Sequence, residues 1–313
     1  MRIVRDHSFV APENRGAVAA VGNFDGVHLG HQAVIAQARG VAAGSGAPLG
    51  VLTFEPHPRR FFAPDAAPFR LMNAEARAHR LERLGVDILF ELSFTTALAG
   101  LSAEAFAREV LHAGLGLSHV VVGADFRFGK GRAGDVGALG ALGAELGFGV
   151  TVADLVTDAG REISSTAIRT ALAEGRCVDA RRMLGHWHRI EGPVLRGDQR
   201  GRELRYPTAN MDLGELHLPR FGVYAVLADV LDGPHAGGYR GVASLGVRPM
   251  FGRNAPNLEV HLFDFAGDLY GAHLSVALVA FQRPEARFES LAALITQMDA
   301  DAAEARRLLT GTG

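Results

Sequence analysis

The stretch Gly22-Asn23-Phe24-Asp25-Gly26-Val27-His28-Leu29-Gly30-His31-Gln32 follows an apolar run, Ala17–Val21, and precedes an Ala-rich run, Ala33–Ala42. The two runs predict a strand followed by a helix. A turn at such a junction presents free backbone N–H groups and the positive end of a helix dipole to an anion. Its glycines allow a phosphate to approach the backbone closely. The sequence therefore predicts an anion site in this turn.

The two histidines of this turn have the spacing H-x-G-H. Imidazole groups donate hydrogen bonds to phosphoryl oxygens as charge develops on them, and this spacing is typical of nucleotidyl transfer. A helix-capping turn with two incidental histidines is the simpler alternative, but spacing and context together favour catalysis. We predict His28 and His31 as catalytic residues. The predicted nucleotide contacts in the turn are Gly22, Asn23, Phe24, Gly26 and Gly30.

Short apolar runs alternate with helical runs through the first half of the chain. The predicted strands are Ala17–Val21, Gly50–Phe54, Asp87–Leu92, His119–Gly123 and Val150–Leu155. The predicted helices are His31–Ala42, Ala74–Leu84, Ala103–Leu111 and Val136–Leu146, followed by a helical bridge from Ser164 to about Gly185. This alternation predicts an α/β domain with a parallel sheet, which binds ligands beyond the carboxyl ends of its strands.

From Arg189 onward the apolar runs read as strands without helices between them. They are Arg189–Leu195, Gly222–Leu231, Tyr239–Leu245, Leu258–Phe265 and Leu274–Phe281. This pattern predicts a small antiparallel β-barrel. Apolar residues at helical spacing between Phe288 and Leu309 predict a closing amphipathic helix. The expected fold class is α/β followed by β, with domains at residues 1–185 and 186–313.

Length, composition and net charge limit the classes of protein to which this chain can belong. With 313 residues, 48% of them hydrophobic, the chain is long enough for two domains that each bury a core. A formal net charge of −2 argues against a nucleic-acid or membrane-surface protein. Cys177 is the only cysteine, which excludes an intrachain disulfide and fits a reducing compartment. Without a signal-peptide core or an apolar run of spanning length, we expect a cytoplasmic protein with no membrane partner.

Three further segments of the first half carry candidate ligand contacts. Ser164-Ser165-Thr166-Ala167-Ile168-Arg169 begins a helix whose hydroxyls and guanidinium suit a phosphate, although capping alone explains a serine there. The basic, Gly-rich and aromatic loop Phe126–Asp135 suits closure on an anionic or planar ligand, with a solvated surface loop as the alternative. The residues that would either wall a flat ligand or pack a core are Phe54, Pro56, His57, Pro58, Phe61 and Phe62.

Four segments together, Gly22–Gln32, Thr53–Pro58, Phe126–Asp135 and Glu162–Arg169, resemble the adenylyltransferase module of prokaryotic bifunctional riboflavin kinase/FAD synthetases. The resemblance implies a Rossmann-like nucleotidyltransferase domain in which the FMN phosphate attacks the α-phosphate of ATP, giving FAD and pyrophosphate. It implies that Arg169 joins the two histidines in catalysis, that Ser165 and Thr166 hold the polyphosphate, and that Asp125 lies beside the nucleotide. The implied flavin contacts are Phe54, Pro56, His57, Pro58, Phe62, Phe126 and Phe128.

The segment Gly201-Arg202-Glu203-Leu204-Arg205-Tyr206-Pro207-Thr208-Ala209-Asn210 resembles the family's second signature, G-R-x-L-G-x-P-T-A-N. The Thr208 hydroxyl and the Asn210 amide oxygen lie two residues apart on an extended segment, so they point the same way and suit one Mg²⁺. A common turn is the alternative.

The segment Asn257–Phe265 resembles the family's E-x-H-x-x-D-F strand, within a riboflavin kinase β-barrel. The resemblance implies that Glu259 accepts the proton of the riboflavin 5′-hydroxyl, which then attacks the γ-phosphate of ATP. A solvated strand face is the ordinary explanation of Glu259. The resemblance also implies that Gly197, Gly201 and Arg202 cover the nucleotide phosphates.

Three positions in the second half depart from the family pattern. Arg205 replaces a glycine, Gln199 stands where glycine is usual, and Met250 replaces the threonine of P-T-F. Three hypotheses remain. The first is a bifunctional enzyme that converts riboflavin to FMN and FMN to FAD, with ATP as substrate and Mg²⁺ as cofactor. The second is a monofunctional FMN adenylyltransferase whose kinase-like domain only binds flavin, and the third is a non-catalytic flavin sensor.

Overall fold

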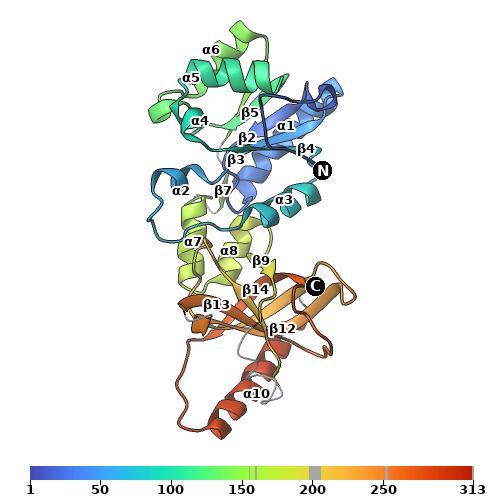
Figure 1. Cartoon of the computed structure of the whole chain (residues 1–313), viewed down its shortest axis with the longest axis vertical. Helices are drawn as coiled ribbons and strands as arrows, with labels where there is room; N and C mark the ends of the chain where they lie inside the picture. Colours follow the sequence, from blue (N-terminus) through green and yellow to red (C-terminus); the bar gives the residue numbers. More distant parts are fainter. Residues whose placement is uncertain (155, 159–160, 197–205, 251–252, 312–313) are drawn as a thin grey trace. The chain divides into compact units, whose positions relative to one another are not determined.

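The computed structural model describes residues 1–154, 156–158, 161–196, 206–250 and 253–311 (Figure 1). Contacts divide the chain into two compact units. The first unit comprises Met1–Ala66 and Arg77–Ile163, and the second unit comprises Ala67–Ala76 and Ser164–Gly313. This division assigns residues 164–185 to the second unit, whereas the sequence pattern places a domain boundary after residue 185. That boundary stays a prediction.

A six-stranded sheet forms the centre of the first unit, in the order β1-β4-β3-β2-β5-β6 (Figure 1). All of its pairings are parallel. Strands β2 and β5 have buried interiors, as expected when helices cover both faces of a parallel sheet. The predicted parallel α/β domain is confirmed. The strands are β1 (Arg2–Val4), β2 (Val18–Val21), β3 (Leu49–Glu55), β4 (Ile88–Ser93), β5 (His119–Gly123) and β6 (Gly149–Ala153).

The helices of the first unit surround this sheet. They are α1 (Leu29–Ser45), α2 (Pro58–Phe62), α3 (Ala74–Arg83), α4 (Thr96–Gly100), α5 (Ala103–Ala105) and α6 (Val136–Leu146), with short 3₁₀ turns at Pro12–Asn14 and Lys130–Arg132. A two-stranded ribbon, β7 (Thr157–Asp158) and β8 (Arg161–Glu162), follows β6.

One predicted helix of the first unit is wrong in type. The α-helix predicted over Ala103–Leu111 lasts only through α5, and a π-helix, η2 (Phe106–Gly114), continues it. The backbone N–H of Leu115 donates to the carbonyl of Val110, the five-residue spacing of a π-helix. These wider turns still bury Phe106, Val110 and Leu111, so the apolar pattern alone could not distinguish the two helix types.

The second unit is built on an antiparallel sheet in the order β10-β13-β12-β11-β14-β9. A bridge between Leu195 and Asn210 connects its two edges, so the sheet closes into a barrel. The predicted barrel is confirmed, although β10 was not predicted. The strands are β9 (Arg189–Pro193), β10 (Ala209–Asp212), β11 (Gly222–Val230), β12 (Gly237–Met250), β13 (Arg253–Leu262) and β14 (His273–Arg283).

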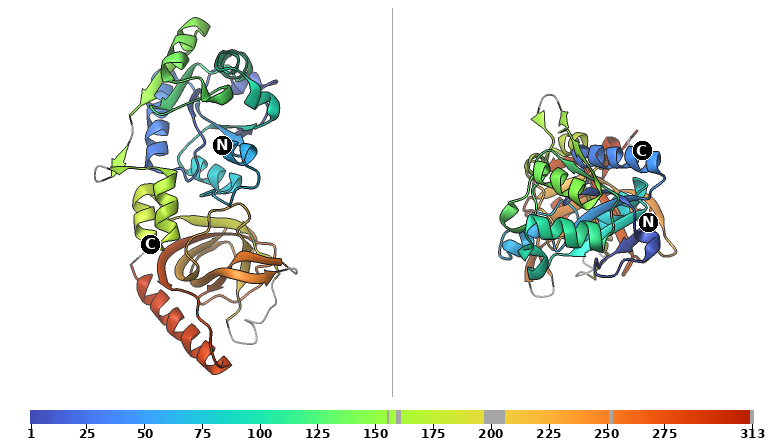
Figure 2. Two further views of the ribbon diagram at one scale, coloured as in Figure 1. Left: turned by 90° about the vertical axis from the view of Figure 1, so that its left-hand side faces the viewer. Right: turned by 90° about the horizontal axis from the view of Figure 1, so that it is seen from above.

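Three helices complete the second unit: α7 (Ser165–Ala173), α8 (Cys177–Leu184) and the terminal α10 (Leu291–Leu308). Helix α10 packs along the barrel wall, as the left view of Figure 2 shows, with Ala305 and Leu309 buried against Phe263. The carboxylate of Asp301 on α10 accepts two hydrogen bonds from the Arg283 guanidinium, at 2.8 and 2.6 Å. Such a bidentate pair fixes the helix against the end of β14.

Candidate active sites

The H-x-G-H turn of the first unit begins where β2 ends. Its backbone takes left-handed conformations at Phe24 (φ 50°), Gly26 (φ 89°) and Val27 (φ 42°). Phe24 and Val27 are nonetheless fully buried, which holds these unfavourable conformations in place. The turn ends at His28, which caps α1: its Nδ1 accepts a hydrogen bond from the backbone N–H of His31 at 3.3 Å. The predicted strand–turn–helix context is therefore present, and so is the helix capping of the simpler alternative.

The rings of His28 and His31 stack on each other, with centroids 3.6 Å apart and planes 17° apart. Since Nδ1 of His28 accepts a hydrogen bond, the proton of its neutral ring lies on Nε2. Nδ1 of His31 is buried and has no hydrogen-bond partner among the residues that the structure describes. Burial, with a smaller contribution from His28, holds the pKa of His31 well below its usual value. His31 is thus a neutral imidazole near pH 7, able to donate one hydrogen bond.

Gly30 lies against the His28 ring. A Cβ at this position would lie 3.1 Å from that ring and 3.7 Å from the carbonyl oxygen of Ile163. The contact with the ring is tight, so a side chain here would require the His28 ring to shift by a few tenths of an ångström. Packing within the turn therefore favours glycine at this position, independently of any phosphate.

The predicted flavin-contacting aromatic residues fall into two clusters. In one cluster, the Phe94 ring lies edge-to-face against Phe54, Phe61 and Phe62, with centroids 5.2–5.7 Å apart. Phe62 is 68% exposed, so its ring face is available to a ligand. His57 caps α2 by accepting the N–H of Arg59 at 3.1 Å. Pro56 and Pro58 flank that cap, which makes the turn rigid.

The second cluster belongs to the loop Asp125–Asp135. Phe128 is buried in the core, stacked on Phe126 with centroids 5.6 Å apart, while Asp125 is exposed. The N–H of Lys130 donates to the carbonyl of Leu101 at 2.7 Å and anchors the loop to the fold. The structure therefore buries the Phe128 ring as part of a packed loop. The contact of these residues with a flavin or a nucleotide stays a prediction.

The predicted phosphate grip lies on α7 in the second unit. Ser164 is the N-cap, accepting the N–H of Ala167 at 3.3 Å, so Ser165 and Thr166 occupy the first helical turn. Thr166 is exposed. Nε of Arg169 donates to the carbonyl of Phe69 at 2.6 Å, and its guanidinium lies 5.6 Å from the Phe69 ring centroid. Arg169 is thus oriented within its own unit, and its predicted role with the histidines stays a prediction.

The predicted kinase residues meet on the barrel. Asn210 on β10 pairs directly with Glu259 on β13, and Glu259 pairs with Ser244 on β12. Leu258 and Val260 face the core, so Glu259 and Asn210 share the opposite face of the sheet. Thr208 immediately precedes β10 and is half-buried. The sheet register therefore brings together the carboxylate and the amide oxygen that the sequence separates by 49 positions.

Asn257 orients the Asn210 side chain. Its Nδ2 donates to Oδ1 of Asn210 at 3.3 Å, and Asn257 is only 1% exposed. This hydrogen bond fixes the Asn210 amide with its oxygen toward Asn257, and a carbonyl oxygen retains a second lone pair for another partner. The alternation of Asn257 and Glu259 around buried Leu258 is a signal from which Asn257 could have been predicted.

Several predicted kinase residues cannot be placed. Gly197, Gln199, Gly201, Arg202 and Arg205 lie outside the described residues, and the side chain of Met250 is also outside the description.

Two family models match this chain, one in each half of the sequence. Residues 10–167 match the family model described as FAD synthetase, and residues 184–309 match the model described as Riboflavin kinase. A curated bifunctional riboflavin kinase/FMN adenylyltransferase from Pseudomonas fluorescens is 46% identical over 98% of both chains. The chain belongs to the family of bifunctional riboflavin kinase/FMN adenylyltransferases.

Another curated relative and a solved structure are similar over nearly the same length. The Escherichia coli K12 riboflavin kinase/FMN adenylyltransferase is 40% identical over 98% of this chain and 97% of its own. A crystal structure described as a macrolide-efflux protein from Streptococcus pneumoniae superposes with a TM-score of 0.82, at 30% identity, over 97% of this chain and 98% of that one. None of the helices in the described residues is long and apolar enough to cross a membrane.

A cavity of about 500 Å³ lies between α10 and the barrel of this riboflavin kinase/FMN adenylyltransferase family member. Its barrel side carries Tyr206, His261 and Phe263, and its helix side carries Ile295, Asp299, Ala302, Ala303 and Arg306. His261 follows Glu259 on the same face of β13, about 7 Å further along. Phe263 lies just beyond the end of that strand. The cavity therefore begins two residues along β13 from the predicted catalytic base.

Polar contacts border this cavity. The Tyr206 hydroxyl donates to Asp299, and burial together with this carboxylate raises the pKa of Tyr206 to about 12. The guanidinium of Arg306 lies 4.2 Å from the Phe263 ring centroid and donates to both oxygens of Asp264, at 2.9 and 3.0 Å. Sequence analysis missed this set, because helical spacing identified only the apolar side of α10.

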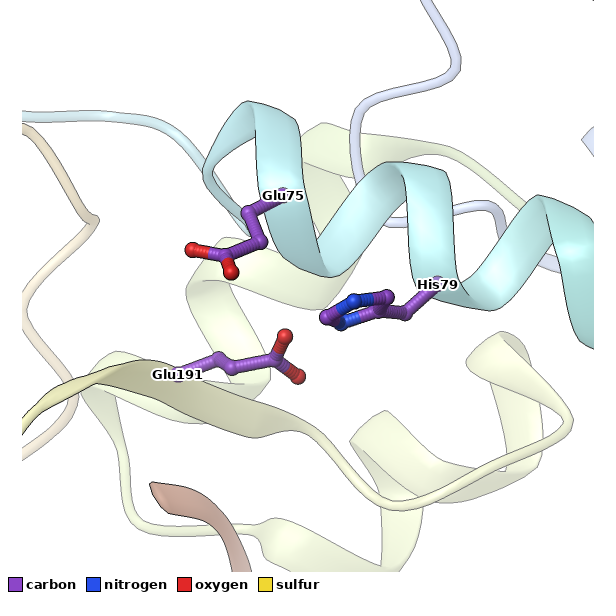
Figure 3. Close-up of side chains that lie close together, drawn as sticks. All are labelled: Glu75, His79 and Glu191. Carbon is purple, nitrogen blue, oxygen red and sulfur yellow. The ribbon is translucent and has the colours of Figure 1, made fainter. Parts of the chain in front are cut away.

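A group of acidic side chains lies elsewhere in the second unit, which includes the first residues of α3 up to Ala76. Figure 3 shows Glu75 on α3 and Glu191 on β9, whose carboxylates lie within 4.8 Å of each other. Nε2 of His273 lies 2.9 Å from the Glu75 carboxylate, and the backbone carbonyl of Glu191 accepts a hydrogen bond from Asn73 at 2.8 Å. Acidic side chains often approach each other without an ion, so we assign no metal here.

Proposed function

We propose that this chain catalyses both steps from riboflavin to FAD. The second unit transfers the γ-phosphate of ATP to riboflavin, and the adenylyltransferase site transfers AMP from a second ATP to the FMN that results. The observation that carries the proposal is the presence of two separate residue clusters, the stacked pair His28 and His31 and the paired residues Asn210 and Glu259, to which we assign phosphate handling. Matches to both family models support the bifunctional hypothesis over the monofunctional one.

In the kinase step, Glu259 accepts the proton of the riboflavin 5′-hydroxyl. The resulting oxygen attacks the γ-phosphorus of ATP, a new P–O bond forms, and ADP leaves with the electrons of the broken bond. Most of the rate in such transfers comes from alignment and electrostatics rather than from covalent chemistry. The direct pairing of Glu259 with both β10 and β12 supports this role, because rigid strands on either side fix the direction of the carboxylate.

We propose that the cavity beside α10 takes the isoalloxazine ring of riboflavin. Its volume of about 500 Å³ suits a ligand of this size. The rings of Tyr206, His261 and Phe263 offer flat apolar surfaces, and Nδ1 of His261 donates to the carbonyl of Pro207 at 2.9 Å, which fixes its ring. A flavin bound here would direct its ribityl chain along β13 toward Glu259.

In the adenylyl step, a phosphate oxygen of FMN attacks the α-phosphorus of ATP. The bond between the α- and β-phosphates breaks, and pyrophosphate leaves with its electrons. Side chains of the turn form no covalent bond; they position the reactants and stabilise charge. Nε2–H of His28 and the ring of His31 donate to phosphate oxygens, and the exposed Phe62 ring stacks on the flavin. Ser165, Thr166 and Arg169 hold the polyphosphate.

The oxygen donors of Thr208 and Asn210 fit Mg²⁺, which prefers hard oxygen ligands. The amide of Asn210 is already oriented by Asn257, so its oxygen is held in place before any ion binds. When bound, Mg²⁺ offsets the negative charge of the ATP phosphates.

The experiment that tests the function is chromatography of the products formed from riboflavin, ATP and Mg²⁺ by the purified full chain. We expect FMN to appear first and FAD to follow, with ADP and pyrophosphate released in the corresponding amounts. A second reaction that starts from FMN should yield FAD alone. FAD from FMN without FMN from riboflavin would instead establish the monofunctional hypothesis, and retained flavin without turnover would establish a sensor.

A further inference from the structure

Arg77 is the bulkiest fully buried side chain of the described residues, although arginine is permanently charged. It is 1% exposed and projects from α3 into the first unit. Nη2 lies 3.0 Å from Oε2 of Glu55 and 3.0 Å from Oε2 of Glu91. Nη1 makes a longer hydrogen bond, 3.4 Å, to the backbone carbonyl of Asn23. A buried charge of this kind is costly unless several partners satisfy it, so its position calls for an explanation.

The three partners of Arg77 come from three neighbouring strands. Asn23 follows the end of β2, Glu55 is the last residue of β3, and Glu91 lies within β4. These strands are adjacent and parallel in the sheet. Asn23 and Glu55 therefore lie at the edge where a parallel sheet binds its ligands.

Two of these partners lead directly into proposed ligand-binding turns. Asn23 immediately precedes Phe24, the first left-handed residue of the H-x-G-H turn. Glu55 immediately precedes Pro56 and the rigid turn that His57 caps. Arg77 thus joins the turn proposed to hold phosphate to the turn proposed to border the flavin.

The Asn23 carbonyl is held from two sides. Besides Arg77, the buried hydroxyl of Thr53 donates to it at 3.1 Å. Left-handed conformations at Phe24 and Val27 are unfavourable, and they persist only where surrounding contacts fix them. The two donors fix the backbone at the point where these conformations begin.

We propose that Arg77 is a positioning residue for adenylyl transfer, acting through the Asn23 carbonyl and Glu55 to set the H-x-G-H turn against the turn at Pro56–Pro58. This proposal rests on the proposed function of the first site. Only a guanidinium can satisfy the role, because its planar fork reaches three acceptors at once, whereas an ammonium is a single compact charge. The charges around Arg77 support this proposal. The carboxylates of Glu55 and Glu91 face Arg77, and the exposed Arg5 donates to Glu91 at 3.3 Å.

The test compares four variants of the full chain, each assayed for FMN formation and for FAD formation. Arg77→Lys keeps the charge without the fork, and Arg77→Met removes both. Thr53→Val is nearly isosteric and removes the other donor to the Asn23 carbonyl. Arg83→Lys on the same helix is the matched control, because Arg83 is exposed. The kinase activity of the same molecule controls for the amount of protein and for folding of the second unit, and hydrogen exchange controls for folding of the first unit.

We expect Arg77→Lys and Arg77→Met to lower kcat for FAD formation about a hundredfold, as a small misplacement of catalytic groups does. Thr53→Val should lower kcat in the same direction by less. FMN formation should equal that of the wild type in every variant, and Arg83→Lys should match the wild type in both reactions. In Arg77→Lys, faster amide hydrogen exchange should be confined to residues 22–31 and 55–59.

Three results would overturn the proposal. One is a kcat for FAD formation equal to the wild type in both Arg77 variants. Another is equal loss of both activities, and the third is faster amide exchange throughout β2, β3 and β5. Each of the last two results would show that Arg77 contributes to the stability of the fold as a whole. Wild-type protein that makes no FAD from FMN would instead contradict the proposed function.

Discussion

The imidazole rings of His28 and His31 lie parallel, 3.6 Å apart, at the start of α1. Two charged imidazolium groups would repel each other at this distance, and burial further disfavours charge on His31. The capping hydrogen bond from the His31 N–H to His28 holds the stacked pair in place, and we propose that the pair donates hydrogen bonds to phosphate oxygens. Such preorganised donors lower an activation barrier without reorganising during the reaction.

Replacing His31 separates the two proposed activities. His31→Ala removes a proposed donor to the phosphates, so FAD formation should fall about a hundredfold or more, while FMN formation is retained. Rates of both reactions, measured by chromatography, check this expectation. His112→Ala is the matched control, because His112 is an exposed histidine of the same unit. Loss of FMN formation in His31→Ala would show that the two sites do not act independently.

Glu259→Gln should have the opposite effect. The amide keeps the size of the side chain but cannot accept the proton of the riboflavin hydroxyl, so FMN formation should fall about a hundredfold or more. FAD formation from supplied FMN should remain. Glu289→Gln, at an exposed glutamate, is the control. A Glu259→Gln enzyme that phosphorylates riboflavin at the wild-type rate would exclude Glu259 as the base.

Cys177 should not react with thiol reagents in the folded protein. Its side chain is 4% exposed at the start of α8, and burial raises the pKa of the thiol to about 11. Since the thiolate is the reactive form, a disulfide reagent at pH 8 should label the native chain very slowly. Labelling followed by absorbance should reach one thiol per chain only after denaturant is added. Immediate labelling of native protein would contradict the buried placement.

The stability of the second unit should fall as the pH drops below 6.5. Burial, with smaller contributions from His186 and His217, lowers the pKa of His188 to about 3, whereas an unfolded histidine titrates near 6.5. Between these values the unfolded chain binds a proton that the folded chain does not. The free energy of unfolding therefore decreases with falling pH, by up to about 1.4 kcal/mol per pH unit from this group, and the contribution is complete above 6.5.

Denaturant unfolding at several pH values checks this expectation, with the fluorescence of Trp187, the only tryptophan, as the signal. His188→Phe should flatten the pH dependence between pH 6.5 and about 3. His112→Gln, at an exposed histidine, should not. Equal slopes for His188→Phe and the wild type would show that folding does not change the pKa of His188.

The fold was predictable where the pattern is long and regular. The strand His119–Gly123 and the helix Val136–Leu146 were predicted with the bounds that the structure has. Short elements were not: β10 has only four residues and follows a proline and a threonine, so its apolar pattern is too brief to read. It forms because β13 and Leu195 supply its hydrogen bonds, and those partners are distant in sequence.

Candidate site residues could be proposed from the sequence where they are grouped locally, and their roles stay predictions. The H-x-G-H turn is one segment, and Glu259 was predicted from the resemblance of its strand to the family's E-x-H-x-x-D-F pattern. Arg77 could not be found in this way, because an arginine on a polar helix looks like a solvated residue. Its importance comes from three acceptors on separate strands, which only the sheet order brings together.

The exposed phenyl ring of Phe62 affects how thermal-unfolding assays of this protein should be interpreted. The Phe62 ring is 68% exposed and lies against the partly buried rings of Phe61 and Phe94, so the three rings form an apolar surface that suits other apolar molecules. Dyes that report thermal unfolding by fluorescing on apolar surfaces should therefore fluoresce with the native protein at room temperature. Flavin should lower that fluorescence by displacing the dye. Dye-based screens of this chain would then register ligand competition at low temperature in addition to denaturation.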